Sequence, residues 1–408
     1  MEQKQTEPLY FHIDVNNAYL SWEALYQKRE LNRTEDIREM DAIIGGDISK
    51  RHGVVLAKSQ SAKRYGIQTG EPVVSAMKKC PHLISFPPHM EYYRGQSKEL
   101  MKLFQKYAPV VDQYSVDEAF LDMTGTQTLY GDPVEFAHKL KDEIRDTLEF
   151  TVNIGISSNR LLAKMASDFS KPDKVHTLFP EEIRDKMWKL PVEDLFYVGK
   201  STAARLHNLG LHTIGDIAKS DLSVLKSHFK SHGEVIYNFA NGIDLTLKDR
   251  TEAEQKGYGN STTIPYDIKE AEDAYRTIMQ LCESVCTRMR RDDVQATVLS
   301  VEIKDSNFVV RRHQRTLLSA TNVTDECYST ACDLFDELWD GEPIRLIGVS
   351  ANKVIDNNMR QLNLFDLESH DRLKNLDSAL DSIREKYGNQ AVTRGTFYKK
   401  QEDDGKRR

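Results

Sequence analysis

The chain has 408 residues, a formal net charge of −7, 39% hydrophobic residues and 29% charged residues. This length is too great for one compact core and predicts about two to four domains. No apolar run is long enough to span a membrane, the first ten residues lack a signal peptide, and the five cysteines are scattered. These features argue against membrane proteins and disulfide-framed secreted domains and predict a cytoplasmic protein.

The first part of the chain has alternating strand and helix patterns. Residues 9–22, LYFHIDVNNAYLSW, begin as a strand and continue as a helix. Residues 53–72 predict a strand, a short helix and a Gly/Pro stop. Residues 114–124, YSVDEAFLDMT, predict a β-hairpin.

Residues 151–173, TVNIGISSNRLLAKMASDFSKPD, predict a strand, a serine cap and a helix that stops by Pro172. The apolar side chains of this helix follow helical spacing, and three polar side chains fall on the opposite face. The apolar set is Leu161, Leu162, Met165, Ala166 and Phe169, and the polar set is Lys164, Asp168 and Lys171.

Residues 190–218 predict short helices around VGKS and LGLHT, the pattern of a helix-hairpin-helix element. Its glycine turn, with Gly199 and Lys200, would offer backbone N–H groups to a phosphate. A bare helical packing unit is the alternative. The polar residues 248–260 predict a linker.

The region after the linker predicts a β-α-β-β-α-β unit of the split, ferredoxin-like kind. Its elements span 258–264, 270–291, 294–304, 307–318, 324–340 and 343–353. The third strand carries Arg311, Arg312 and Arg315, which suits a sheet laid along a phosphate backbone. Such basic clusters offset the net negative charge, which by itself argues mildly against nucleic acid.

Three carboxylates lie where two of the predicted strands could pair. Asp14 ends the first strand, and Asp117 and Glu118 lie in the hairpin. Three anions this close need cations, and hard oxygen ligands suit Mg²⁺. A lone Asp-Glu pair is more often a surface pair, but the basic side chains at Lys63, Arg64, Lys164 and Lys171 could hold a triphosphate beside it.

Four motifs, in this order and spacing, resemble those of the Y-family (translesion) DNA polymerases. They are FHIDVNNAYLSWE, SAKRYGIQTGEP, YSVDEAFLDMT and GISSNRLLAKMASDFSKPD, and the resemblance covers about residues 8–355. It implies an α+β right-hand fold with a ferredoxin-like palm, small fingers, a helix-hairpin-helix thumb and a β-α-β-β-α-β little finger. The implied boundaries are palm 1–25 and 89–176, fingers 26–88, thumb 177–245, linker 246–257, little finger 258–355 and a C-terminal tail 356–408.

The resemblance also implies roles for single residues. Asp14 and Asp117 would bind two Mg²⁺ ions, helped by the Val15 carbonyl, and Glu118 would bind the ion at the primer 3′-hydroxyl. Lys171 would hold the triphosphate, with help from Lys164. Tyr19 would be the steric gate that meets C2′ of the sugar.

The resemblance implies a DNA-templated DNA polymerase of low fidelity that tolerates damaged templates. One segment departs from the common pattern, because Gln60 and Lys63 stand where many members carry Tyr and Arg. Lysine keeps the charge of the lost arginine but not its bidentate fork. This departure places the chain nearer the UmuC-like branch than the DinB-like one.

The expected partners are primer-template DNA, dNTPs and a replicative sliding clamp. Residues 361–366, QLNLFD, match a bacterial clamp-binding peptide at Gln361, Leu362, Leu364 and Phe365. A packed strand is the alternative for this peptide. The next segment predicts an amphipathic helix of unknown partner, with Leu373, Leu376, Leu380, Ile383 and Tyr387 at helical spacing. We expect a monomer; a need for a recombinase filament stays open.

Two other functions fit parts of the sequence. A non-catalytic DNA-binding repair scaffold would share the predicted thumb and little finger but would not need the three carboxylates. A nucleotide cyclase of the palm type is suggested by GGD at 45–47, which lies outside the acidic hairpin.

Overall fold

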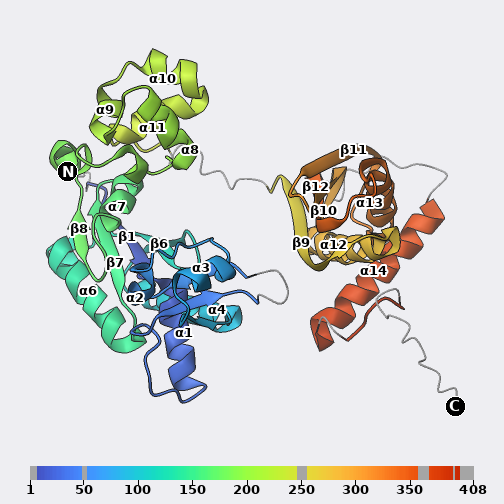
Figure 1. The fold of residues 1–408 in the computed structure, drawn as a ribbon. Helices are drawn as coiled ribbons and strands as arrows, with labels where there is room; N and C mark the ends of the chain where they lie inside the picture. Colours follow the sequence, from blue (N-terminus) through green and yellow to red (C-terminus); the bar gives the residue numbers. More distant parts are fainter. Residues whose placement is uncertain (1–6, 48–52, 246–254, 357–366, 389–390, 396–408) are drawn as a thin grey trace, which may run out of the picture. The chain divides into compact units, whose positions relative to one another are not determined.

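The computed structural model describes residues 7–47, 53–245, 255–356, 367–388 and 391–395. The chain forms two compact units, one from the described residues up to 245 and the other from those that begin at 255 (Figure 1). Among the described residues, no helix combines the length and the apolar character that a bilayer crossing requires.

The first unit is built around a five-stranded sheet with the order β5-β6-β1-β7-β8. Only β7 and β8 run parallel to each other. The strands are β1 (Tyr10–Val15), β5 (Val110–Gln113), β6 (Glu118–Asp122), β7 (Val152–Ser157) and β8 (Val175–Thr177). A hairpin of β5 and β6 is found, but it begins before the predicted range 114–124, which contains the turn and β6.

The two faces of this sheet differ in chemistry, because successive side chains of a strand point to opposite sides. On β1, Phe11, Ile13 and Val15 enter a large apolar core. That core is closed by α1 (Ala18–Arg29), α4 (Met90–Phe104) and α6 (Pro133–Leu148). His12 and Asp14 point to the other face, which α7 (Arg160–Ser167) covers in part. The polar residues of the sheet therefore gather on one side.

The close approach of α7 to the sheet depends on a glycine in β7. A Cβ atom at Gly155 would lie 1.9 Å from the Ala163 carbonyl oxygen. The helix begins after Asn159, whose side chain accepts a hydrogen bond from the Leu162 N–H. The predicted serine cap is therefore wrong by one or two positions, because the asparagine side chain reaches the free N–H group.

A small three-stranded sheet, β3-β2-β4, lies between the first helix and α4 in the chain. β2 (Ala42–Gly45) pairs antiparallel with β3 (Val55–Lys58) and parallel with β4 (Ile84–Phe86). Short helices α2 (Gln60–Lys63) and α3 (Val73–Lys79) accompany it. The predicted strand, short helix and stop at 53–72 are confirmed.

The helical part of the first unit follows β8. Its core joins the apolar side chains of α7 to those of the later helices, so this region packs on α7. After 3₁₀ and π turns at 180–194 come α8 (Lys200–Asn208), α9 (Ile214–Lys219), α10 (Leu222–Phe229) and α11 (Ser231–Ala240). One further short helix of this unit, α5, spans Gln127–Tyr130.

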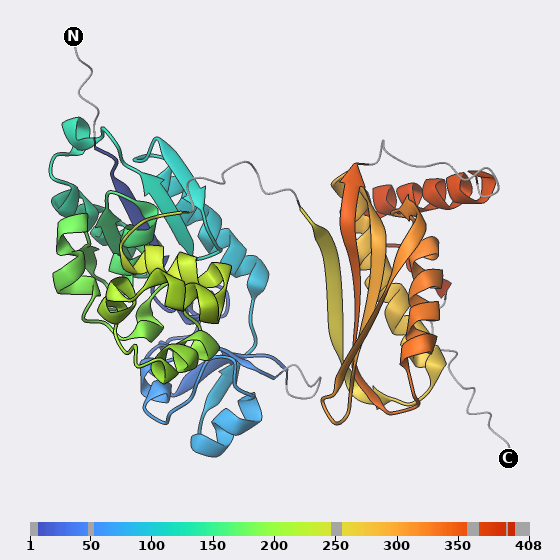
Figure 2. The ribbon, with the colours of Figure 1, turned by 90° about the horizontal axis from the view of Figure 1, so that it is seen from above.

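The second unit is a four-stranded antiparallel sheet, β11-β10-β12-β9, with two helices on one face (Figure 2). The elements are β9 (Gly257–Ile268), α12 (Ala271–Arg291), β10 (Val294–Asp305), β11 (Val310–Thr321), α13 (Thr324–Leu338) and β12 (Ile344–Asp356). The β-α-β-β-α-β order is confirmed, and each crossover spans one strand. The strand order is not ferredoxin-like, because the first and third strands occupy opposite edges here instead of lying side by side.

The C-terminal helix α14 (Leu367–Tyr387) contacts α12 and α13 with its charged side. Asp377, with 3% of its side chain exposed, binds Arg290 at 3.0 Å and accepts the Thr324 N–H at 2.8 Å. Leu376 and Tyr387 are 48% and 67% exposed. The predicted helix is confirmed, but most of its apolar stripe does not pack on the body.

Candidate active site

Asp14 and Glu118 are direct partners in the ladder between β1 and β6. Opposite residues of an antiparallel pair share a face, so both carboxylates point to the polar side of the sheet. Asp14 is buried, with 11% of its side chain exposed, and Glu118 is 23% exposed. The predicted meeting of these two strands is therefore found.

Asp117 joins this pair from the hairpin turn. Its carbonyl accepts the Val15 N–H at 3.0 Å, and its carboxylate accepts a hydrogen bond from the Ser115 hydroxyl at 2.6 Å. Asp14 and Asp117 line one open cavity of about 320 Å³. The other residues that line it are Val15, Asn17, Ala18, Tyr19, Leu56 and Ala57.

Two lysines neutralise the carboxylates. Lys171 Nζ contacts Asp14 Oδ2 and also lies 2.9 Å from Asp168 Oδ1. Lys164 Nζ lies 2.5 Å from Glu118 Oε2, and only 10% of its side chain is exposed. Both lysines were predicted near the site, and the structure brings both to it.

The surroundings shift the pKa values of the two paired carboxyl groups in opposite directions. Burial raises the pKa of Asp14 to about 6, although Lys171 opposes the rise. Burial also acts to raise the pKa of Glu118, but the nearby His12 ring and the hydrogen-bonded Lys164 outweigh it and lower that pKa to about 2. Asp14 is therefore the carboxyl group that gains most from a cation stronger than one lysine.

The donor set fits a hard divalent cation. Buried Asp14 and the half-buried Asp117 and Glu118 offer carboxylate oxygens, and Val15 lines the cavity with Asp14 and Asp117. Mg²⁺ prefers such oxygen ligands and keeps part of its water shell, which an open cavity allows.

Tyr19 lies on the wall of the same cavity, at the start of α1. Its ring stacks on Tyr93, with centroids 5.4 Å apart and planes at 22°. Asn17, just before the helix, has a left-handed φ of 50° and donates a hydrogen bond to the Lys58 carbonyl oxygen at 2.8 Å. This bond ties the helix start to β3, so the position of Tyr19 is well fixed.

The remaining residues predicted to contact the nucleotide or the DNA lie apart from this wall. Gln60 and Lys63 are in α2, and Lys63 and Arg64 are exposed. Among the described residues that line the cavity, none comes from α2. Gly199 is the N-cap of α8 and Lys200 its first residue, and both are exposed.

The three arginines of β11 divide between the two sides of its sheet. Arg311 binds Asp340 at 2.7 Å, and Arg315 binds Asp333 at 3.2 Å and Glu337 at 2.5 Å, so both contact residues of α13 or its end. Arg312 points to the side without helices. It pairs with Glu302 there and lines a hollow of about 350 Å³.

The sequence analysis missed His12, which lies beside the carboxylates, and Arg160, one helical turn before Lys164 in α7. His12 is buried, its Nδ1 lies 2.8 Å from the Ser167 hydroxyl, and its Nε2 lies 3.5 Å from Glu118 Oε2. Burial lowers its pKa, which keeps it neutral. Arg160 lies over the Phe120 ring at 4.0 Å. The two-residue spacing from Asp14 could have identified His12.

The predicted clamp peptide, with Gln361, Leu362, Leu364 and Phe365, lies outside the described residues. Its role remains a prediction.

Models of known families match three parts of the chain. Residues 13–168 match the impB/mucB/samB family, residues 255–364 match the C-terminal domain of that family, and residues 193–244 match the thumb domain of DNA polymerase-iota. Together these matches cover most of the chain.

Curated relatives are similar over nearly their whole length. A DNA polymerase IV of Clostridium acetobutylicum is 44% identical over 393 residues, which are 96% of this chain and 98% of the relative. A DNA polymerase IV of Acetivibrio thermocellus is 34% identical over 389 residues, or 94% and 96%. These names belong to the DinB-like branch. The expected placement nearer UmuC is therefore wrong, because it depended on two positions only.

A solved structure agrees on the fold. A Y-family DNA polymerase chimera of Dbh and Dpo4 superposes with a TM-score of 0.71 at 22% identity, over 86% of this chain and 100% of the chimera. The right-hand α+β fold is thereby confirmed. With the full-length relatives and the family matches, it follows that the chain belongs to the Y-family of DNA polymerases, in the impB/mucB/samB family.

Proposed function

We propose that this chain is a DNA-templated DNA polymerase that extends primers past damaged template bases with low fidelity. The observation that carries the proposal is the ladder pair of Asp14 and Glu118, joined by Asp117 at one cavity. Family membership supports the reaction, and the damage tolerance comes from the resemblance.

Asp14, Asp117 and Glu118, with the Val15 carbonyl, would hold two Mg²⁺ ions. Divalent metal at such a site activates the attacking hydroxyl and neutralises charge on the phosphates. The chain's own groups do the rest. Lys171, 39% exposed, would leave Asp14 and turn to the triphosphate, while Lys164 and His12 hold Glu118 in its ionised form. Tyr19 would contact the sugar.

The sheets, helices and compact units support the proposed boundaries of the palm, fingers, thumb and little finger. The five-stranded sheet takes strands from both predicted palm segments, 1–25 and 89–176, and the three-stranded sheet lies within the predicted fingers, 26–88. The four helices α8 to α11 lie within the predicted thumb, 177–245. The second compact unit begins close to the predicted little finger at 258.

Primer extension with Mg²⁺ and dNTPs tests the proposal. We expect Asp14→Ala, Asp117→Ala and Glu118→Ala each to abolish extension while primer-template binding survives, because phosphate contacts elsewhere supply most of the affinity. Asp122→Asn is the matched control, since it lies on the same strand as Glu118 and its amide can still accept the Thr124 N–H. The control should extend primers normally.

Near-parental extension by any of the three variants would refute the metal assignment. DNA binding without extension by the parent would instead support the non-catalytic repair scaffold.

For partners, we propose primer-template DNA, dNTPs and a sliding clamp that binds the peptide at 361–366. A tether to the clamp would raise the local concentration of the primer end for an enzyme that holds its substrate loosely.

A further inference from the structure

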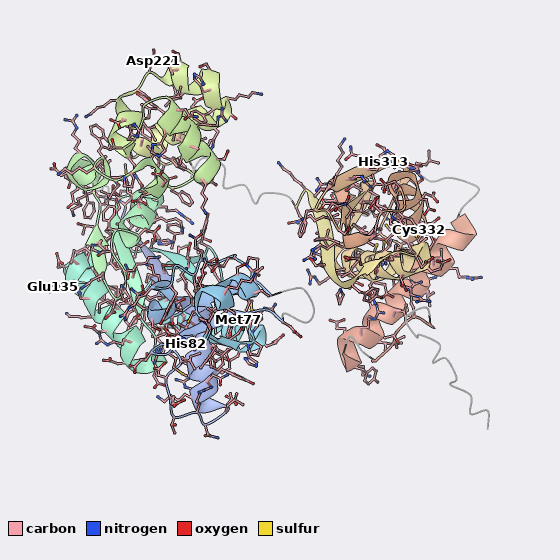
Figure 3. The ribbon with its side chains drawn as sticks, in the orientation of Figure 1. Met77, His82, Glu135, Asp221, His313 and Cys332 are labelled. Atoms are coloured by element: carbon pink, nitrogen blue, oxygen red, sulfur yellow. The ribbon has the colours of Figure 1, made fainter. Side chains whose placement is uncertain are left out.

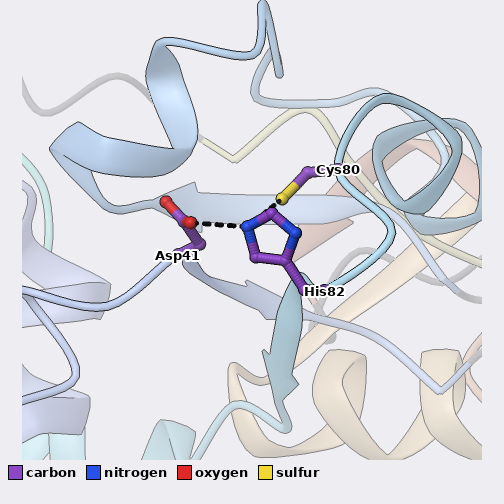
Figure 4. A group of neighbouring side chains, drawn as sticks. All are labelled: Asp41, Cys80 and His82. Atoms are coloured by element: carbon purple, nitrogen blue, oxygen red, sulfur yellow. Dashed lines mark hydrogen bonds and ion pairs between the residues drawn. The ribbon is translucent and has the colours of Figure 1, made fainter.

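Three potential metal ligands meet in the small β3-β2-β4 sheet, away from the three carboxylates (Figure 4). Asp41, Cys80 and His82 each offer one ligand atom, and these atoms all lie within 4.8 Å of one another. His82 Nε2 lies 2.8 Å from Asp41 Oδ2 and 3.5 Å from Cys80 Sγ. One ring nitrogen is thus shared by a carboxylate and a thiol.

The backbone fixes this arrangement. Asp41 immediately precedes β2, and the Ile84 N–H donates to the Asp41 carbonyl oxygen at 2.9 Å where β2 and β4 pair. Cys80 ends α3, and its carbonyl accepts the Leu83 N–H at 3.1 Å. The tight turn between them brings His82 beside Asp41. The cluster therefore depends on a sheet pairing and a helix end, which are rigid supports.

The sulfur–nitrogen distance matches that of a tetrahedral zinc site. With Zn–S of about 2.3 Å and Zn–N or Zn–O of about 2.0–2.1 Å, tetrahedral angles place sulfur and nitrogen about 3.5 Å apart and oxygen and nitrogen about 3.3 Å apart. The observed sulfur–nitrogen distance is 3.5 Å. The observed oxygen–nitrogen distance of 2.8 Å is that of a hydrogen bond. Asp41 and His82 would have to move slightly apart to bind zinc.

We propose that Asp41, Cys80 and His82 form a zinc site in this sheet, with three protein ligands and a fourth position for water. Thiolate and imidazole ligands select zinc over Mg²⁺, so the site would not compete for the polymerase's own metal. His82 is 62% exposed, which leaves a path for the ion, and Cys80 is buried, which shields the sulfur.

Binding would exchange one proton for the metal. The Cys80 sulfur is buried, and a thiol at neutral pH carries a proton. Coordination removes that proton to solvent and forms the metal–sulfur bond. The Tyr65 hydroxyl lies 3.4 Å from His82 Nε2.

The bound ion would link the turn between α3 and β4 to the residue that precedes β2. Metal that binds only the folded state stabilises it by mass action. The first unit should therefore unfold at a higher temperature with zinc than without.

Cobalt titration of the chelator-treated full chain, in excess Mg²⁺, tests the proposal. We expect one equivalent of Co²⁺ to give a sulfur-to-cobalt charge-transfer band and the visible bands of a tetrahedral site, and zinc to displace it. His82→Ala and Asp41→Asn should weaken binding at least about tenfold. His82 is exposed, so this variant should fold even where Cys80→Ser does not.

Two matched controls lie in the other unit (Figure 3). Cys332→Ser on α13 and His313→Ala on β11 remove the same ligand types and should keep the parental spectrum. Absence of a thiolate band in the parent, or an unchanged band in folded His82→Ala, would overturn the proposal. In either case the hydrogen-bonded pair of Asp41 and His82 would be a structural contact only. Primer extension in Mg²⁺ reports separately on the polymerase reaction.

Discussion

Asp14 and Glu118 stand opposite each other between β1 and β6, yet each carboxylate is bound to a different lysine. Lys164 is almost buried and comes from α7, which packs on the sheet. Lys171 follows that helix and is 39% exposed. One ammonium group is therefore a fixed part of the site and the other is free to change partner.

Replacing Lys171 by Ala should reduce kcat/KM for the incoming dNTP roughly tenfold or more, because a charged hydrogen bond contributes about 1.5–3 kcal/mol. Lys174→Ala, an exposed lysine three residues further on, is the control and should have little effect. Steady-state single-nucleotide insertion measures both. Equal kinetics for the two variants would remove Lys171 from the nucleotide site.

Tyr19→Ala should admit ribonucleotides, because the ring stacked on Tyr93 forms part of the cavity wall beside Asp14. Tyr19→Phe keeps the ring and should keep the discrimination against ribonucleotides. The ratio of dNTP to rNTP insertion efficiency measures this effect. If the parent already inserts ribonucleotides as readily as Tyr19→Ala, Tyr19 is not the gate.

Arg312→Ala should weaken DNA binding across sequences and reduce the slope of log K against log salt by about one. Arg311→Ala and Arg315→Ala should leave the slope unchanged, since these side chains bind carboxylates at the α13 side of the sheet. Binding titrations over a salt series test the division. A reduced slope for Arg315→Ala with none for Arg312→Ala would reverse it.

Glu149 gives a pH dependence of stability that is separate from the metal site. Hydrogen bonds from Lys28 and Arg29, both at 2.6 Å, lower the pKa of Glu149 to about 2 from its usual 4.5. A carboxyl group with a lowered folded-state pKa stabilises the fold above pH 4.5, and this contribution disappears as the pH falls toward 2. Each such exposed pair contributes about 0.2–1 kcal/mol.

Glu149→Gln should therefore lower the thermal midpoint at pH 7 but not at the acid end of a pH series. Glu91→Gln, at a side chain that is 95% exposed, is the control and should change the midpoint little at any pH. A midpoint difference between Glu149→Gln and parent that stays constant from pH 7 to acid would contradict the assignment.

Changes in the clamp peptide should reduce primer extension only when the sliding clamp is present. Leu364→Ala together with Phe365→Ala should leave unassisted extension intact and remove stimulation by loaded clamp, because these side chains would fill the clamp's apolar pocket. Asn363→Ala lies between anchors and is the matched control. Extension on a circular primed template, with and without clamp, separates the cases. Equal stimulation of parent and double variant would exclude this peptide.

The sequence predicted the sheet that carries the site because period-two patterns are local and strong. The same pattern placed Asp14 and Glu118 together once the two strands were paired. The buried state of Lys164 was not predicted, since it depends on how closely α7 approaches Gly155.

Contacts between distant segments escaped prediction. Helical spacing in α14 located the helix, but the partner of Asp377 is Arg290, 87 residues away, so the docked side could not be inferred. Asp41 and His82 meet only through the parallel pairing of β2 and β4. Such pairings depend on the whole fold, and the residues near each position carry no signal for them.

The central place of β1 in its sheet has a consequence for motion. Both of its edges are hydrogen-bonded, to β6 and to β7, so its amide hydrogens should exchange with deuterated water among the slowest in the first unit. Amides near exposed Lys63 and Lys171 should exchange much faster. Asp14 on β1 would thus stay in place over many turnovers, while the exposed Lys171 can rearrange.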